Sequence, residues 1–363
     1  MRRHWALFCV VALSISLSCA NAETLRIATF NTELHRDGPG LLLRDIQRAK
    51  DPQIKAVIAV ITVVSPDILA LQGIDWDYEG AALEALANQL EESGLSYPYR
   101  FALRPNSGMA TGLDMDGDGR LGRPRDAQGY GAFTGQGGLA ILSRYPIRHN
   151  IVQDFTPLMW RDLPGAILPT HSNGKPFPSA EALAAQRLSS TSHWVVPIDL
   201  PNGTQISLLT FHAGPPVFDG PEDRNGRRNH DEIRFWRLFL DGKIGDPPAG
   251  QFVLAGGATL DPFDSEGRNQ VIATLLNDSR LQDPTPSSAG ATLAPDQGHI
   301  GRNALDTVDW PKPGRLRVDY VLPSRDLPII GTAVHWPAPG TAGYDDAITA
   351  SRHRLVWVDL NLD

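Results

Sequence analysis

Short apolar runs alternate with amphipathic stretches along the first third of the chain. Residues 25–30 predict a strand that ends at Asn31. A helix is predicted next, because Asp51 can cap it and Pro52 suits its first turn. The continuous apolar run 68–71 is typical of a strand covered on both faces, and a second helix follows it. The order strand, helix, strand, helix predicts a layered α/β domain. The apolar faces of the two helices are Ile54, Val57, Ile58 and Ile61, then Leu83, Leu86, Ala87 and Leu90.

The same patterns continue to the end of the chain. No internal repeat of fixed period and no long linker divides it, so we expect a single domain over residues 23–363. The region 283–314 is rich in Pro, Gly and Ala and predicts a long surface excursion. Further strands are predicted at 138–143, 194–200, 206–211, 252–255, 317–322 and 351–358, with helices around 233–240 and 271–275.

The first 22 residues have the pattern of a secretory signal peptide. Arg2 and Arg3 precede the apolar run 5–17, and small residues stand at 20–22. We therefore expect cleavage near Ala22 and export to the periplasm or outside the cell. A lipid anchor on Cys19 is the alternative, but Leu17 lies one place too close to that cysteine for the usual pattern.

Both cysteines of the chain, Cys9 and Cys19, fall inside this signal. The remaining 341 residues (363 minus 22) then have no disulfide, and a hydrophobic core is their main support. No later apolar run approaches the length of a membrane span, so no membrane partner is expected.

The charge balance argues against a nucleic-acid partner. Loss of Arg2 and Arg3 would change the formal net charge from −8 to −10. An acidic surface repels nucleic acid unless a basic patch overrides it, and the chain has only short basic clusters. We expect no tight nonspecific binding of DNA.

The longest concentration of polar residues follows a predicted strand. Residues 206–211 end at His212, and the segment 219–232 is then dense in charged and amide side chains. Because loops held by a sheet often carry function, Asp219, Arg224 and Asn225 are candidate ligand-binding residues. The alternative is a solvated polar loop that caps the next helix.

A second acidic pattern lies between the halves of the chain. Asp114, Asp116 and Asp118 stand at alternate positions before Gly119, which matches the first half of a calcium loop. The twelfth position is Arg125 instead of Glu, and neither flank is predicted to be helical. The segment is therefore predicted to be either a calcium-stabilised loop or a plain acidic turn.

Seven segments spread over nearly the whole mature chain form a recognisable set. They are LRIATFN, PDILALQ, GLAILSRYPI, the strand before His212, FVLAGGATLDP, RVDYVLP and SRHRLVWVDL. Together they resemble the endonuclease/exonuclease/phosphatase superfamily. The resemblance implies a deoxyribonuclease-I-like fold, a four-layer α/β sandwich of two mixed β-sheets flanked by helices. It also implies a phosphoesterase site where strand ends meet.

The resemblance implies catalytic roles for Asn31, His212, Asp319 and His353, which match the family pattern. Hydrolysis of an anionic phosphodiester requires a metal to neutralise charge and a basic group to activate water. The chain departs from the family where these groups are expected. It has Leu71-Gln72-Gly73 for LQE, Gly257-Ala258-Thr259 for D-x-N, and Ser351-Arg352-His353 for SDH.

These departures weaken the case for standard magnesium-dependent hydrolysis. Mg or Mn is expected only if the altered site still binds metal, with Asp75, Asp77 or Asp261 as substitute ligands. Arg352, together with Asn31, is a candidate to hold a phosphate or carboxylate group.

Three functions remain open at this point. The first is a secreted hydrolase-like protein with a rebuilt phosphoesterase site. The second is a non-catalytic protein that binds a small phosphorylated or anionic ligand in the old cleft. The third is a calcium-dependent extracellular structural module. Structural alternatives also remain for the four matching residues: Asn31 bonding loop backbone, Asp319 pairing with Arg352, and His212 and His353 as core histidines.

Overall fold

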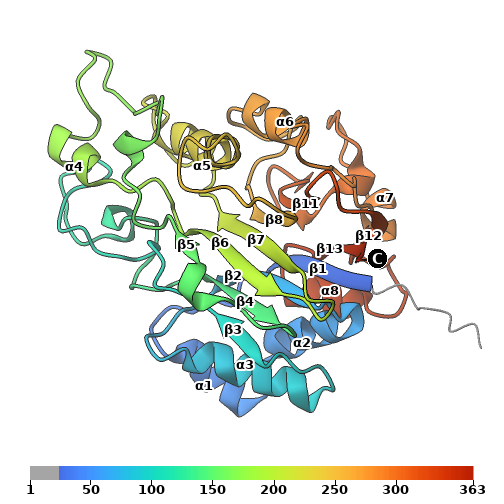
Figure 1. The fold of residues 1–363 in the computed structure, drawn as a ribbon. Coiled ribbons are helices and arrows are strands. Elements are labelled where there is room, and N and C mark those ends of the chain that lie inside the picture. The colour runs from blue at the N-terminus through green and yellow to red at the C-terminus, as the bar shows by residue number, and fades with distance from the viewer. Residues whose placement is uncertain (1–23, 363) are drawn as a thin grey trace, which may run out of the picture.

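Two mixed β-sheets pack face to face at the centre of the molecule (Figure 1). The computed structural model describes residues 24–362, so the predicted signal peptide lies outside the described residues. The first sheet has the order β12 (Ile329–Val334), β13 (Val356–Asn361), β1 (Thr24–Asn31), β2 (Ile68–Ile74), β4 (Gly138–Ser143) and β3 (Tyr99–Phe101). The second has the order β11 (Asp319–Pro323), β8 (Phe252–Gly257), β7 (Gln205–His212), β6 (His193–Asp199) and β5 (Gln153–Asp154).

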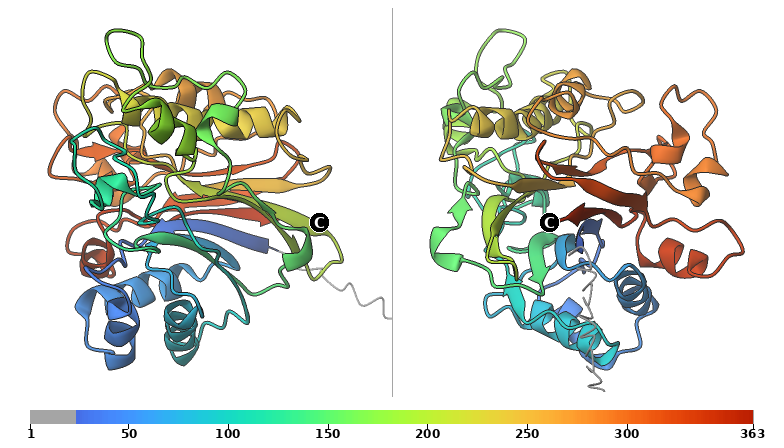
Figure 2. Two further views of the ribbon diagram at one scale, coloured as in Figure 1. Left: turned by 90° about the vertical axis from the view of Figure 1, so that its left-hand side faces the viewer. Right: turned by 45° about the vertical axis from the view of Figure 1, so that its right-hand side comes forward.

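Helices cover the outer face of each sheet (Figure 2). The first sheet is covered by α1 (Leu41–Arg48), α2 (Pro52–Val64), α3 (Ala81–Glu92) and α8 (Tyr344–Ala350), and the second by α5 (Arg224–Leu240) and α6 (Gln270–Leu276). The four-layer α/β sandwich is therefore confirmed. The connections carry α4 (Ala180–Ala185), α7 (Ala289–Thr292), the 3-10 turns η1 (Pro124–Asp126), η2 (His149–Ile151), η3 (Trp160–Asp162) and η4 (Asn303–Leu305), and the small pair β9 (Val308–Asp309) and β10 (Arg315–Leu316).

Successive side chains along each central strand pack into different hydrophobic cores, one between the sheets and one under the helices. In β1, Ile27 enters the core between the sheets, while its neighbour Ala28 enters the core under the helices. In β2, Ala70 and Leu71 divide in the same way. Successive side chains on a strand point to opposite faces, so an unbroken apolar run fits a strand buried on both sides.

The predicted helix starts agree with the structure where a specific cap marks them. The Asp51 side chain accepts a hydrogen bond from the backbone N–H of Ile54 at the start of α2. None of the helices within residues 24–362 is long and apolar enough to cross a membrane.

The predicted strand 351–358 begins too early. The chain enters β13 only at Val356. Before it, the Ser351 hydroxyl donates to the carbonyl of Asn31 and accepts from the backbone N–H of His353. These side chain to backbone bonds hold the segment as a loop and compete with strand pairing.

The segment 219–232 is also not one loop, because α5 begins at Arg224. Its polar side chains find partners in the neighbouring backbone. The Arg228 guanidinium donates to the carbonyls of Leu188 and Ser189, and the Asn229 amide donates to that of Gly214. Buried polar groups satisfied in this way stabilise the helix against the sheet instead of facing a ligand.

Candidate functional site

The polar residues of the candidate site gather at one edge of the two sheets. Because β1 and β2 are parallel, Asn31 lies opposite Gln72 where both strands end. In the second sheet, His212 pairs with Gly257 at the ends of parallel β7 and β8. Antiparallel β11 begins at the same edge, where Asp319 pairs with Gly257. Backbone register therefore places His212, Gly257 and Asp319 in one row.

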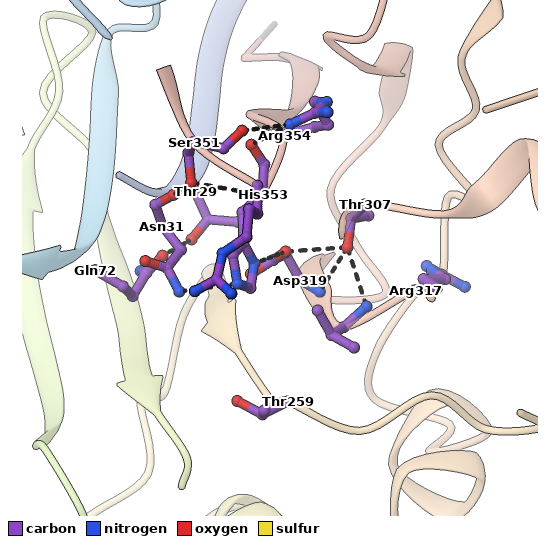
Figure 3. Close-up of polar contacts among 12 residues, drawn as sticks. Thr29, Asn31, Gln72, Thr259, Thr307, Arg317, Asp319, Ser351, His353 and Arg354 are labelled. Atoms are coloured by element: carbon purple, nitrogen blue, oxygen red, sulfur yellow. Dashed lines mark hydrogen bonds and ion pairs between the residues drawn. The ribbon is translucent and has the colours of Figure 1, made fainter. Parts of the chain in front are cut away.

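Asp319 and His353 form a buried hydrogen-bonded pair (Figure 3). Their Oδ2 and Nδ1 atoms are 2.8 Å apart, and the Thr307 hydroxyl donates to the same carboxylate oxygen at 3.0 Å. Because a carboxylate only accepts, Nδ1 of His353 carries the proton and Nε2 retains its lone pair. Asn31 Nδ2 lies 3.3 Å from Nε2, in position to donate to it. The arrangement holds one histidine tautomer.

Two buried polar atoms beside this pair lack a hydrogen-bond partner among residues 24–362: Asp319 Oδ1 and His212 Nδ1. The pKa of His212 is lowered to about 4, mainly by burial and then by the nearby His353, while Asp319 and Glu33 act in the opposite direction. His212 is therefore neutral at neutral pH. A Cβ atom at Gly257 would lie 3.0 Å from His212 Cδ2 and 3.4 Å from Asp319 Oδ1. Gly257, where the resemblance implies an aspartate, thus stands between these two side chains.

Gly73 has a backbone conformation that favours glycine. Its φ is +70°, and the strand pairing shifts between Gln72 and Ile74. A Cβ atom there would lie 2.5 Å from Asn31 Oδ1 and 2.9 Å from the backbone nitrogen of Glu33. A glutamate at this position would require the neighbouring backbone to move.

Glu33 is the site residue that the sequence analysis missed. Its carboxylate accepts hydrogen bonds from the backbone N–H and the Nε of Arg352, both at 2.8 Å, and lies 3.1 Å from the Ser351 hydroxyl, whose proton it shares with the Asn31 carbonyl. The Arg352 Nη2 makes a further close contact. Burial alone would raise the pKa of Glu33, but the hydrogen bond from Arg352 and the charge of His353 hold it at about 2.

The pairing of charges at this edge differs from the alternative considered above. Asp319 pairs with His353 and not with Arg352, whose charge is balanced by Glu33. The signal for Glu33 in the sequence was its place two residues after Asn31. It was weak because the backbone there is left-handed, with φ of 49°, which a strand pattern does not predict.

The donor groups at this edge do not fit the magnesium ion that the resemblance implies. Such an ion takes a near-octahedral set of oxygen ligands. Positions 73 and 257 supply no side chain, and the Glu33 carboxylate is committed to Arg352. Asp319 offers one oxygen, Oδ1, because Oδ2 already bonds His353.

The proposed substitute ligands are also committed elsewhere. Asp75 accepts from the backbone N–H groups of Arg36 and Gly137, each at 2.9 Å. Asp77 caps α3 by accepting from two backbone N–H groups of its first turn at 2.8 Å. Asp261 accepts from the backbone of Arg317 at 2.9 Å and from its own loop. All three carboxylates therefore cap turns or a helix, and these roles occupy the oxygens that a metal ion would need.

The three ligand candidates near the start of α5 bond to nearby protein groups. The Asp219 carboxylate accepts from the backbone N–H of Asn225, whose amide donates to the Val217 carbonyl at 2.7 Å. The Arg224 guanidinium donates to the Met115 carbonyl in the acidic loop. Their role in ligand binding stays a prediction.

The acidic loop has the compact form that its spacing predicts. One carboxylate oxygen from each of Asp114, Asp116 and Asp118 can be chosen so that all lie within 4.8 Å of one another. Asp114 also accepts from the backbone N–H groups of Gly117 at 2.7 Å and Gly119 at 2.9 Å. Both predicted alternatives, a calcium loop and an acidic turn, are consistent with this geometry.

Comparison with known proteins identifies the family. The model of the Endonuclease/Exonuclease/phosphatase family matches residues 28–353, and the chain belongs to this family. No curated protein matches it. Among solved structures, an endonuclease/exonuclease/phosphatase from Beutenbergia cavernae is similar, with 18% identity, a TM-score of 0.54, and 93% of this chain and 72% of that chain covered. A family protein from Leptotrichia buccalis has 14% identity, a TM-score of 0.51, and coverage of 93% and 99%.

Proposed function

We propose that this chain is a phosphoesterase-like member of its family with an altered site. In this proposal the edge formed by Asn31, His212 and His353 receives a small phosphorylated or other anionic group. Standard magnesium-dependent hydrolysis does not take place there. The observation that carries the proposal is the buried Asp319–His353 pair, whose Nε2 is held in the accepting tautomer.

The chemistry proposed for this pair is general-base catalysis. Asp319 orients the imidazole and stabilises the imidazolium that forms when Nε2 takes a proton from water. The Asn31 amide, 3.3 Å from Nε2, is close enough to donate to an oxygen of the bound group instead. Neutral His212 lines the same edge and adds no charge there.

A second candidate is a non-catalytic binding protein. The Glu33–Arg352 ion pair favours it. Arg352 stands where the family pattern has an aspartate, and Glu33 neutralises its charge, so neither side chain is free to take part in catalysis. It is also favoured by the absence of side chains at Gly73 and Gly257. In this case the unpaired Asp319 Oδ1 and His212 Nδ1 serve recognition only.

We also propose that the mature protein is exported after cleavage near Ala22. Arg2, Arg3 and the apolar run after them support this proposal. N-terminal sequencing of the protein recovered from a periplasmic or culture-medium fraction tests it, and an intact leader in the cytoplasmic fraction would contradict it.

An assay across substrates and metals tests the proposed activity. Purified mature protein is given DNA, bis-nitrophenyl phosphate or nitrophenyl phosphate, with Mg, Mn, Ca or EDTA. Turnover that persists in EDTA and falls at least about a hundredfold in His353→Ala supports the hydrolase, because general-base groups contribute factors of this size. The exposed His149 supplies the matched control, His149→Ala, which should keep full activity.

The same samples separate the remaining outcomes. Inactivity throughout, with phosphate binding that weakens in Asn31→Ala but not in His149→Ala, supports the binding protein. Turnover that requires magnesium and disappears in Asp319→Ala contradicts the proposal that the standard route is lost. Inactivity without phosphate binding rejects both candidates.

A further inference from the structure

A surface cavity of about 350 Å³ lies just past the end of β2, between α1 and the first turn of α3. This volume is within the range of roughly 300–1,000 Å³ that small-molecule sites occupy. Its walls combine aromatic, aliphatic and acidic side chains. Those that the argument uses are Leu43, Asp75, Trp76, Asp77, Tyr78, Glu79 and Phe133.

Three aromatic residues contribute to the walls of this cavity. Trp76 is anchored because its backbone N–H donates to the Gly135 carbonyl at 2.8 Å, and its side chain is partly buried. Phe133 is partly buried too, whereas Tyr78 is 90% exposed. The face of an aromatic ring attracts a cation through its quadrupole. Because Trp76, Tyr78 and Phe133 all line the cavity, their rings are available for a contact of this kind.

The polar part of the lining is acidic. Asp75, Asp77 and Glu79 line the cavity, and no Lys, Arg or His does. Asp75 and Asp77 are hydrogen-bonded to backbone N–H groups, which fixes their positions. Glu79 is exposed and has no hydrogen bond or ion pair among residues 24–362. The charges around the cavity therefore favour a cationic ligand over a neutral or anionic one.

Burial raises the pKa of Asp75, and the charges of His35 and Arg36 oppose this rise. Arg36 contacts Asp75 only through its backbone N–H. Its guanidinium is turned toward Asp45 and Asp51, at 3.1 and 3.2 Å. Glu79, which has no ion pair among the described residues, is therefore the acidic side chain of the lining that is free to meet a cation.

We propose that this cavity binds a small organic cation, an ammonium group carrying a compact apolar body. The ammonium lies against the aromatic side chains near Glu79, and the apolar part contacts the partly exposed Leu43 and Ala81. This proposal does not depend on the proposed function, because it uses none of the residues at the Asp319–His353 edge.

Isothermal titration calorimetry on the mature protein tests this with two probes of nearly the same shape. Choline chloride carries the charge, and 3,3-dimethylbutan-1-ol replaces the ammonium nitrogen by carbon. Choline should bind and the alcohol should bind at least fivefold more weakly. Tyr78→Ala should weaken choline binding by about two- to fivefold, the size of a cation–π contact at an exposed site. Glu79→Gln should weaken it by a similar factor, and less at high salt.

Two exposed residues outside the cavity give matched controls. Tyr130, which is 73% exposed, and Glu84 on α3 do not line it. Tyr130→Ala and Glu84→Gln should leave choline binding unchanged. Equal binding of the neutral alcohol would overturn the proposal, because it would show that the cavity binds apolar groups without regard to charge. Equal losses in the control variants, or no binding of either probe at millimolar concentration, would also overturn it.

Discussion

The contact between Glu33 and Arg352 is the residue-level feature that most changes the picture of the site. It ties the loop that carries His353 to the strand end that carries Asn31. Arg352 had been a candidate to hold an anion, but its Nε and Nη2 are already used by Glu33. The ion pair therefore holds Asn31 and His353 in position, and it leaves Arg352 less able to bind an anionic ligand.

Glu33→Gln should change how stability depends on acid. The pKa of Glu33 is about 2 in the folded chain against 4.5 as its ordinary value, so its ionised form stabilises the fold above pH 4.5. That contribution is lost as the pH falls toward 2. The variant should therefore show a shallower fall in the free energy of unfolding between pH 4.5 and 2. At neutral pH the loss should be about 1–2 kcal/mol, because Arg352 is half exposed and its charge is screened.

Urea unfolding monitored by circular dichroism across this pH range gives the comparison. The exposed Glu181 on α4 supplies a control, Glu181→Gln, which should follow the wild-type slope. Identical slopes for wild type and Glu33→Gln would contradict the stabilising role of this carboxylate.

The family resemblance indicated the four matching residues but not the hydrogen bonds among them. The apolar runs located Asn31 and His212, which each end a strand, whereas the predicted strand 317–322 began two residues before Asp319. His353 lies in a loop, and its bond to Asp319 spans 34 residues, which no local pattern encodes. Such contacts depend on how the two sheets are stacked.

At the scale of secondary-structure elements, strands and helix starts were predicted correctly where a single local sequence signal determines them. The strand Gly138–Ser143 and the Asp51 cap of α2 were both predicted at the correct positions. The first half of α5 was missed because its charged residues suggest solvent, while Arg228 and Glu232 are buried against loop backbone. Burial of polar groups by a distant segment overrides the pattern of a helix face.

The acidic loop belongs to the same scale, and its calcium prediction can be tested by metal removal. If Asp114, Asp116 and Asp118 hold calcium, EDTA should lower the melting temperature by roughly 2–5 °C and added calcium should restore it, because ligand binding stabilises the folded state. Asp116→Asn should remove the response to EDTA. Differential scanning calorimetry makes the measurement.

The exposed Asp162 on η3 provides the control for this loop. Asp162→Asn should keep the wild-type response to EDTA. A melting temperature that does not change with EDTA or calcium would leave the segment as an acidic turn.

Across the whole molecule, the core between the two sheets joins elements from both ends of the chain. Strands β1 and β13 contribute Ile27 and Val358 from one sheet, and β6 and β7 contribute Val196 and Leu208 from the other. Neither inner face can be covered without the opposite sheet. This mutual burial supports the proposal that residues 23–363 form a single domain.

Leu208→Ala should therefore destabilise both sheets together. Leu208 is 1% exposed, and removing a buried leucine side chain costs about 2–5 kcal/mol. Thermal unfolding followed by calorimetry and by circular dichroism should shift as one transition. Ile330→Ala on β12, where the side chain is 57% exposed, should change stability by less than about 0.5 kcal/mol. Separate transitions for the two probes would contradict a single domain.

The backbone at Gly73 excludes a simple exchange of this glycine for a larger residue. A single Gly73→Glu change would introduce a carboxylate into a left-handed turn, against Asn31 Oδ1 and the Glu33 backbone. The Glu33 main chain would have to retreat first, and Glu33 is itself held by Arg352. A carboxylate at position 73 alone would therefore meet a backbone that cannot accept it, and the Glu33–Arg352 contact would have to rearrange at the same time.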